Sequence, residues 1–490
     1  MSTLTTTKPV SAPNDSGTNA SPGIGETDGA GWSPGQEHHW KTLTAKGFHC
    51  AVRPRIGTTL GVGLGTSMSL APSLLPRTPS AQAMLTGMLV VVALTVAGVI
   101  RFTLRRSNIN GRLDRFRAPL LGSTMVAVVG MVAHATHWQN RLRSAMDTAL
   151  IGPDYWLRWG LISVAIVGVF VGIARAAGWF VRKSGWARSI AVGVAAASVL
   201  YLVGVPAAVD WRHGAYAAAN ATIDPALVQP VSYARSGSAE SAISWGSLGA
   251  EGRKFVTGSP PGPIRVYVGL DSAPDLDSRV ALAVRELERS GGFERSNIVL
   301  AVPTGSGWID ANAVRGFYER FDDDVALVGM QYSYAPSWVT FAFGRDDAVA
   351  YARALFNAVE HHIGTLDHKP KLYVYGQSLG ALGGSSIFAN DADQDRRTCA
   401  TLWAGPPAGQ VHRAGATVLA NSSDPVVHWS PSLLWRAPEL RGVRVDAPVP
   451  QWLPVISFLQ TSADLLAALN APPGHGHRYG TDQGTALGTC

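Results

Sequence analysis

The first half of the chain contains five apolar runs separated by short polar connections. Most of these runs reach the roughly 20 residues that a helix needs to cross a bilayer, whereas the first run is shorter and rich in glycine. The pattern therefore predicts a domain of about five transmembrane helices. The runs are Ile56–Ala71, Ala81–Ile100, Ala118–His137, Leu157–Val181 and Ala187–Val209.

The second half changes to short β-branched apolar segments that alternate with helical patterns. This alternation is typical of an α/β domain with a doubly wound, mostly parallel sheet, in which the working residues gather at the carboxyl ends of the strands. The predicted strands are Ile264–Leu270, Asn297–Pro303, Val325–Gln331, Lys371–Tyr375, Cys399–Ala404 and Ala416–Ala420, and the main predicted helices are Ser278–Ser290, Ala311–Arg320 and Asp346–His362.

These patterns divide the chain into four parts. Residues 1–45 are rich in Thr, Ser, Pro and Gly without an apolar period, which predicts a disordered tail. Residues 46–213 form the multi-pass membrane domain, and residues 214–263 form a linker or entry segment. Residues 264–490 form the α/β domain. The tail lacks the apolar core of a cleavable signal peptide, so the first membrane helix is expected to act as an uncleaved signal.

The charge is distributed unevenly along the 490 residues. Up to Arg212 there are 20 Lys and Arg against 8 Asp and Glu, whereas 21 basic and 26 acidic residues follow. The basic residues cluster between the apolar runs and do not form a stripe interleaved with aromatic residues. We therefore expect a lipid bilayer as partner and no nucleic acid.

The basic residues also predict which side of the cell membrane each part occupies. Positive charge is strong before the first run, weak after it, strong between the second and third runs, weak again, and strong before the fifth run. By the positive-inside rule this places the N-terminus inside and everything after Val209 outside, so the α/β domain is expected to be extracytoplasmic. Four helices counted from the same N-terminus would place it in the cytoplasm.

The three cysteines show neither a disulfide framework nor the spacing of a zinc site. Cys50 lies on the predicted inner side, and only Cys399 and Cys490 could meet outside. We expect that none of them pair, and we predict no metal and no cofactor.

A pentapeptide, Gly376-Gln377-Ser378-Leu379-Gly380, carries the clearest chemical signal. A β-rich segment precedes it and small helix-compatible residues follow it, as in the nucleophile elbow of an acyl-transferring hydrolase. Such a sharp turn needs glycine on both sides of the serine for steric reasons. We therefore predict that Ser378 is a nucleophile.

A serine nucleophile needs a base and an acid that orients the base, and in this fold they follow in the order Ser, Asp or Glu, His. Asp424 follows a predicted strand in Asn421-Ser422-Ser423-Asp424-Pro425 and is the preferred acid. Asp446 and Asp464 are the alternatives.

The segment Pro472–Gly480 contains two histidines, His475 and His477, that could reach back over the serine. Neither is accompanied by a further ligand at metal spacing, which favours the role of a base. The flanking glycines favour His475, and His477 stays open. His428 is interpreted as a loop residue.

The oxyanion hole requires backbone N–H groups beside the serine. Leu379 is the first predicted donor, and the turn of Gly305, Ser306 and Gly307 is the second, with Gly269–Ser272 as the runner-up. Gln331–Trp338 is interpreted as an aromatic pocket wall or, equally, as core packing. Ser247 lies in a similar tetrapeptide without the elbow spacing and is expected to be structural.

Taken together, these segments resemble the bacterial membrane-bound α/β-hydrolase family, which carries an N-terminal multi-pass domain. The resemblance implies a serine hydrolase fold on a membrane domain. This chain departs from the family pattern at Gln377, where an acidic residue is expected, and in the short connection from Gly405 to Asp424, which would remove part of a lid. The matching segments are Pro72–Arg77, Pro303–Trp308, Gln331–Trp338, Gly376–Gly380, Ser423–Pro425 and Gly474–Tyr479.

The preferred functional hypothesis is an esterase- or lipase-like enzyme that acts on lipid or cell-envelope acyl esters. In this hypothesis Ser378 attacks the carbonyl, His475 or His477 moves the proton, and Asp424 orients the imidazole. Two alternatives remain: an acyltransferase that uses the same triad, and a binding or scaffold protein that keeps the fold without turnover.

Overall fold

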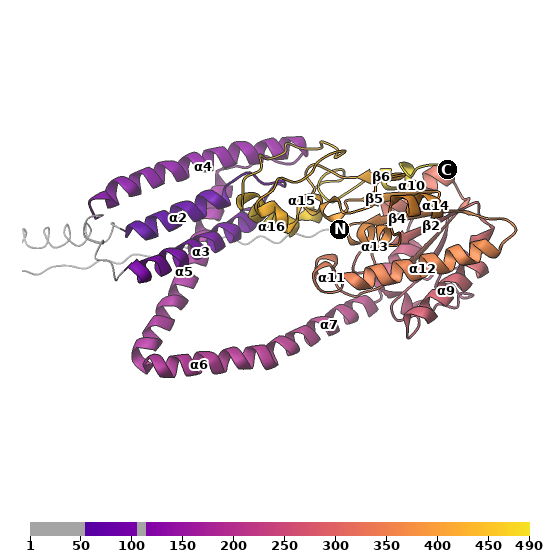
Figure 1. The fold of residues 1–490 in the computed structure, drawn as a ribbon, viewed down its shortest axis with the longest axis horizontal. Coiled ribbons are helices and arrows are strands. Elements are labelled where there is room, and N and C mark those ends of the chain that lie inside the picture. The colour runs from indigo at the N-terminus through magenta and orange to yellow at the C-terminus, as the bar shows by residue number, and fades with distance from the viewer. Residues whose placement is uncertain (1–53, 105–113) are drawn as a thin grey trace, which may run out of the picture. The chain divides into compact units, whose positions relative to one another are not determined.

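A computed structural model describes residues 54–104 and 114–490. The predicted tail over residues 1–45, Cys50 and the basic residues of segment 105–113 lie outside the described residues. The described chain consists of apolar helices followed by an α/β region, as the hydrophobic pattern predicts (Figure 1).

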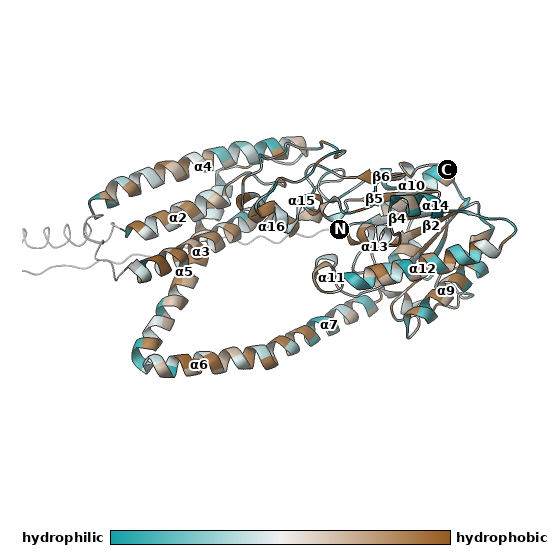
Figure 2. Cartoon of the chain, viewed as in Figure 1, coloured by the Kyte–Doolittle hydropathy of each residue, from teal (hydrophilic) through white to brown (hydrophobic). Residues whose placement is uncertain are grey.

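Within the described residues, the N-terminal region contains four helical spans that are long and apolar enough to cross a membrane, and Figure 2 shows the many hydrophobic residues along them. The spans are α3 (Pro79–Leu104), α4 (Arg117–Ala145), α5 (Pro153–Ser184) and a continuous span from Trp186 to Ala221, in which α6 (Trp186–Val199) and α7 (Val205–Ala221) are joined by a short π-helical turn.

The first predicted span is the exception. Helix α2 (Ile56–Ser69) has 14 residues, which corresponds to about 21 Å at the helical rise, less than the roughly 30 Å of a hydrocarbon core. Its glycines serve close packing against α3: a Cβ atom at Gly65 would lie 2.7 Å from the backbone of Val90, and one at Gly61 would lie 3.3 Å from the backbone of Ala93. The small residues of α2 thus allow two helix backbones to approach each other.

The connection between α2 and α3 is anchored to the C-terminal part of the chain by a buried ion pair. Arg77 donates from Nε and Nη2 to Oδ1 of Asp464, at 3.0 and 2.8 Å, and Leu74 N donates to Oδ2 of the same carboxylate at 2.8 Å. The side chains of Arg77 and Asp464 are 4% and 1% exposed. Asp464, an alternative triad acid in the sequence, lies in α16 (Ile456–Leu465), so its carboxylate holds the two regions together.

Helix α4 contributes to the same junction. Gln139 accepts from Arg77 N at 3.0 Å, and Trp138 Nε1 donates to Ser73 O at 2.9 Å. Burial raises the pKa of Asp464, and the Arg77 guanidinium opposes this shift. The pair is therefore stable only while both partners and their surrounding hydrogen bonds are present.

The α/β region is built on a six-stranded sheet with the order β1-β3-β2-β4-β5-β6, in which every pairing is parallel. The prediction of a doubly wound, parallel sheet is confirmed. The strands are β1 (Ile264–Val268), β2 (Asn297–Val302), β3 (Val325–Met330), β4 (Lys371–Gln377), β5 (Ala400–Ala404) and β6 (Ala416–Leu419).

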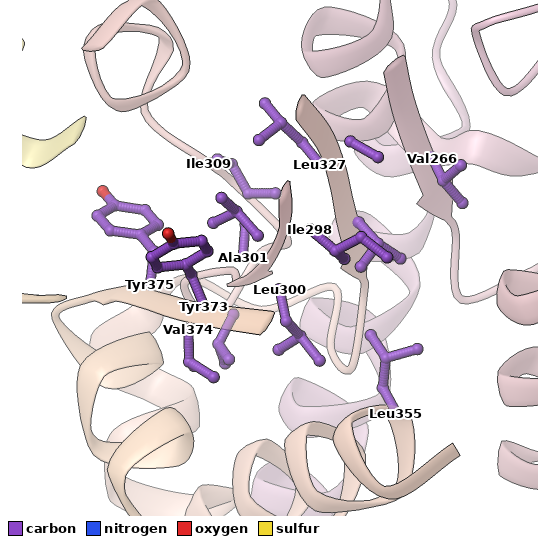
Figure 3. Close-up of a cluster of buried hydrophobic side chains, with 14 of the residues drawn as sticks. Val266, Ile298, Leu300, Ala301, Ile309, Leu327, Leu355, Tyr373, Val374 and Tyr375 are labelled. Carbon is purple, nitrogen blue, oxygen red and sulfur yellow. The ribbon is translucent and has the colours of Figure 1, made fainter. Parts of the chain in front are cut away.

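Helices cover both faces of the sheet. On one face, α10 (Ala311–Phe321) places Phe317 against Tyr375, with ring centroids 5.4 Å apart. The preceding residue of β4, Val374, points the other way. It lies with Leu300 of β2 and with Leu355 of α12 (Arg345–Thr365) (Figure 3). This period-two alternation in β4 buries both faces of the strand.

The remaining described elements complete these layers and the loops around the carboxyl ends of the strands. They are α8 (Gly249–Thr257), which lies within the predicted linker, α9 (Leu276–Arg289), α11 (Ser337–Phe343), α13 (Leu379–Ser385), α14 (Asp391–Arg397), α15 (Pro425–His428) and α17 (Asp482–Thr485), together with short 3₁₀ turns.

Cys399 and Cys490 form a disulfide, so the expectation that no cysteines pair is wrong. Their Cα atoms are 4.9 Å apart although 91 residues separate them. The pairing arises because α17 packs beside α10 and brings the end of the chain back to the start of β5. The closed loop contains Asp424, His475 and His477, and closing a loop of this length lowers the entropy of the unfolded chain by an equivalent of about 4 to 5 kcal/mol.

Replacing Arg77 by Leu should strongly lower the apparent melting temperature, because it leaves the Asp464 carboxylate buried without its cation, at a cost of about 3 to 5 kcal/mol. Thermal unfolding of the full chain in detergent measures this effect. Arg441→Leu is the matched control, since Arg441 and Glu439 form an ion pair whose side chains are 90% and 64% exposed. This substitution should shift the melting temperature little. Equal shifts in the two variants would contradict the role given to the buried pair.

Candidate functional site

Ser378 occupies a strained backbone position between β4 and α13. Its φ of 55° and ψ of −124° are unfavourable for a residue with a Cβ. Its N–H donates to Ala404 O of β5 at 2.9 Å, which ties the turn to the neighbouring strand. The residue is 8% exposed. The serine therefore sits at the carboxyl end of β4, where the elbow motif predicted it.

The two glycines of the motif are required by close backbone contacts. A Cβ atom at Gly376 would lie 2.3 Å from Gly380 O, and one at Gly380 would lie 2.2 Å from Val302 O at the end of β2. Real side chains do not tolerate such distances, so the turn closes only with glycine at both positions. A specific close backbone contact thus explains why the motif has glycine at each of these two positions.

His477, and not His475, pairs with Asp424. The His477 ring donates from Nδ1 to Oδ2 of Asp424 at 2.7 Å, and both side chains are buried. With Nδ1 carrying the proton toward the carboxylate, Nε2 carries the lone pair. Nε2 is buried and has no hydrogen-bond partner among the described residues, so it is the ring atom available to a serine proton.

Asp424 is held by bonds to both carboxylate oxygens. It caps α15, where Oδ1 accepts from Val426 N at 2.8 Å, and Oδ2 accepts a second bond from the Tyr479 hydroxyl at 2.7 Å. Burial and the nearby Asp424 raise the pKa of Tyr479 well above its usual value, so the phenol remains a donor. The sequence prediction missed Tyr479, and its signal was its position two residues after His477.

His475 belongs to a second pair. Its Nδ1 lies 3.0 Å from Oδ2 of Asp446, the other alternative acid. Asp446 also accepts from Ser423 N at 3.0 Å and from the Ser423 hydroxyl, and that hydroxyl accepts from Gly476 N at 2.7 Å. Because Ser423 precedes Asp424 and Gly476 precedes His477, this network joins the two loops that carry the first pair. His475 and Asp446 therefore support the site from outside it.

Two contacts bring His477 to the serine turn. Gln377 donates from Nε2 to His477 O at 3.3 Å. A Cβ atom at Gly405 would lie 2.6 Å from Cε1 of His477, and Gly405 directly follows Ala404, the acceptor of the Ser378 N–H. Gln377, which departs from the acidic residue expected by resemblance, thus supplies an amide donor to the histidine loop.

The predicted oxyanion donors lie beside the elbow. Leu379 is the first residue of α13, where a helix leaves its N–H group without an intrahelical acceptor. The turn 304–308 also borders this helix, because a Cβ at Gly380 would lie 2.8 Å from Pro303 O. Gly305 N donates to Ser337 Oγ at 3.1 Å and Gly307 N to Thr304 O at 2.9 Å. Two of the three predicted N–H groups of the turn are thus already engaged, and Ser306 lies half-buried between them.

The runner-up segment lies elsewhere. Gly269–Ser272 follows β1, which is separated from β4 by β3 and β2 in the sheet order. A Cβ atom at Gly269 would lie 2.0 Å from Ser247 O, and the Ser247 hydroxyl donates to Ser244 O at 3.1 Å. Ser247 and this segment therefore pack together as structural elements.

The aromatic run Gln331–Trp338 is divided between core and surface. Tyr332 is buried, donates to Pro303 O at 3.0 Å and packs with Leu379 and Leu382 of the elbow helix. Trp338 is 67% exposed. The run therefore supports the elbow helix at one end and faces outward at the other.

His428 is buried beside these loops, and its Nε2 lies 2.9 Å from Ser422 O. Desolvation lowers its pKa, although Asp424 opposes the shift, so this imidazole is neutral at pH 7. Within residues 54–104 and 114–490, no group of three or more His, Cys, Asp or Glu side chains is arranged to hold a metal ion.

Comparisons with known proteins agree with this fold. The profile described as "Alpha/beta-hydrolase family" matches residues 264–416 and 410–488, and the profile described as "Alpha/beta-hydrolase family N-terminus" matches residues 70–260. No curated protein and no solved structure matches the chain. Together the two profiles cover the apolar helices from the end of α2 onward and the whole sheet with its elbow, so the chain belongs to this alpha/beta-hydrolase family.

Proposed function

We propose that this protein is a membrane-anchored serine hydrolase that cleaves acyl esters. The observation that carries the proposal is the buried His477–Asp424 pair, packed by way of Gly405 and Gln377 against the strained turn that holds Ser378. A strained serine, a histidine with a free Nε2 and a buried orienting carboxylate are the parts of an acyl-transfer site.

In the proposed reaction, Nε2 of His477 takes the proton of Ser378 Oγ as the oxygen attacks the ester carbonyl carbon. Asp424 keeps the histidine in the required tautomer and stabilises the imidazolium that forms. The negative charge on the carbonyl oxygen is stabilised by the Leu379 N–H and by the Ser306 N–H, the predicted donor of the turn that is not engaged by Ser337 or Thr304. The imidazolium then protonates the leaving alcohol, and water releases the acyl group from Ser378 by the same steps.

The contacts of α16 support an extracytoplasmic position for this site. Through Arg77, α16 joins the ends of the spans near residues 70–79, and Gln139 of α4 belongs to the same junction. The opposite span ends carry the strongly basic connections, Arg101–Arg117 and Arg182–Arg188, which the positive-inside rule keeps in the cytoplasm. This argument uses only the spans from α3 onward, so it does not depend on whether α2 crosses the membrane.

The disulfide supports the same assignment. The Cys399–Cys490 bond lies in the α/β region, and such bonds persist mainly in oxidising compartments outside the cytoplasm.

A fluorophosphonate probe should label the wild-type protein covalently and should fail to label Ser378→Ala, because the probe reacts with an activated serine hydroxyl. Gel fluorescence of the purified full chain measures the labelling. Ser247→Ala is the matched control and should label like wild type, since Ser247 is hydrogen-bonded within its own turn. A folded wild-type protein that is not labelled would favour the scaffold alternative.

Exchanging the two histidines separately should distinguish their roles. His477→Gln should lower kcat for a short p-nitrophenyl ester by about 10⁴-fold, because the general base is lost. His475→Gln should keep kcat within about tenfold of wild type, because this residue only supports the loops. Comparable losses in both variants, with unchanged melting temperatures, would refute the assignment of the base to His477.

Reporter fusions should place the catalytic region outside the cytoplasm. Alkaline phosphatase, which is active only after export, should be active when fused after Cys490 and inactive when fused after Gly185, in the basic connection between α5 and α6. Phosphatase activity of colonies measures both fusions, and green fluorescent protein should give the reverse pattern. Activity of the Gly185 fusion alone would invert the proposed topology.

A further inference from the structure

A cavity of about 220 Å³ lies against α16, outside the site described above. Its walls are mostly apolar and include Leu74, Leu433, Leu440, Val449 and Trp452. A cavity with such walls suits an apolar ligand, because filling it removes hydrocarbon from water.

Two polar side chains at the cavity wall, Gln460 and His428, are already engaged. Gln460 accepts from Arg77 and donates from Nε2 to Met68 O at 2.6 Å, and the neutral His428 ring is bonded to Ser422 O. Of the described residues that line the cavity, none carries a full charge. A charged ligand would therefore find no complementary charge there.

One wall of the cavity comes from the junction with the membrane helices. Pro72 and Leu74 belong to the connection between α2 and α3. The segments on either side of α16 also expose large apolar side chains that have no cover within the described chain: Trp435, Leu453, Val455, Leu466 and Leu469. Exposed apolar groups at the ends of membrane helices are suited to a lipid surface, where aromatic and aliphatic side chains sit at the interface.

Another part of the wall comes from the loop of the proposed catalytic acid. His428 lines the cavity, and its backbone N–H donates to Asp424 O at 3.4 Å. The next residue, Trp429, lies between Phe341 of α11 and Phe458 of α16, with ring centroids 6.3 and 5.9 Å away. Phe341 packs on the cluster that contains Leu379, the residue after Ser378. Apolar side chains thus link the loop that borders the cavity to the serine turn.

We propose that this cavity binds the acyl chain of a long-chain lipid ester taken from the bilayer, with the ester group directed toward Ser378. The proposal rests on the hydrolase function proposed above and adds its substrate class. The cavity then accounts for the contact between α16 and the membrane helices. The acyl chain leaves the lipid surface beside Pro72 and Leu74 and stays in an apolar environment up to the catalytic loops.

A variant that fills the cavity tests this assignment. The double variant Leu440→Trp with Val449→Trp is tested as the full-length protein in lipid nanodiscs. It should lower kcat/KM for p-nitrophenyl palmitate by at least about tenfold, because several methylenes of the acyl chain are no longer buried in the cavity. The same variant should hydrolyse p-nitrophenyl butyrate within about twofold of wild type. Val231→Trp is the matched control, since Val231 is 95% exposed and its replacement should leave both rates unchanged.

The outcomes separate this proposal from the one on which it rests. Equal effects on both esters, or no effect on either, would overturn the acyl-chain site while Ser378-dependent butyrate hydrolysis still supports the hydrolase. A lipid bound there only as a structural component would give that same chain-length-independent result. Absence of any Ser378-dependent hydrolysis by the wild-type protein would overturn both.

Discussion

The site depends on a backbone strain at one residue. Ser378 is held at a positive φ, a conformation that costs of the order of 1 to 3 kcal/mol. Gly376 approaches Gly380 so closely, and Gly380 the end of β2, that no larger residue fits at either glycine. The burial supplied by the sheet offsets the strain. Because β4 lies between β2 and β5 in the sheet, the turn is supported from both sides.

The two histidine–aspartate pairs show how a loop-borne site acquires rigidity. Asp424 and His477 come from loops that are 53 residues apart in sequence, and neither belongs to a long helix or strand. The Asp446 network ties these loops to each other. The Tyr479 hydroxyl and the Val426 N–H each donate a further hydrogen bond to the Asp424 carboxylate. The disulfide closes the same segment from its ends. In this site, hydrogen bonds between the loops provide the rigidity that the backbone hydrogen bonds of a helix or strand would otherwise provide.

The junction around Arg77 links the site to the apolar helices. A buried ion pair is costly unless its hydrogen bonds are complete, and here both partners also bond to backbone groups and glutamines from α16 and from the connection between α2 and α3. Such a junction restrains α16 relative to the ends of the helices. In the proposed function, this restraint keeps the apolar cavity open toward the lipid surface and directed toward the catalytic loops.

Much of the architecture could be predicted from the order of residues along the chain. Apolar runs of membrane length, the β-α alternation and the elbow glycines are local patterns, because helix length, strand period and the sterics of one turn depend on near neighbours. The short helix α2 was predicted as a span because its run is apolar like the others, although it is shorter and richer in glycine. The choice of His477 over His475, the part played by Tyr479, the Cys399–Cys490 pair and the roles of Asp446 and Asp464 were decided only by tertiary structure. Each depends on which distant loop or helix lies opposite the side chain, and the short-range pattern of a sequence does not contain that geometry.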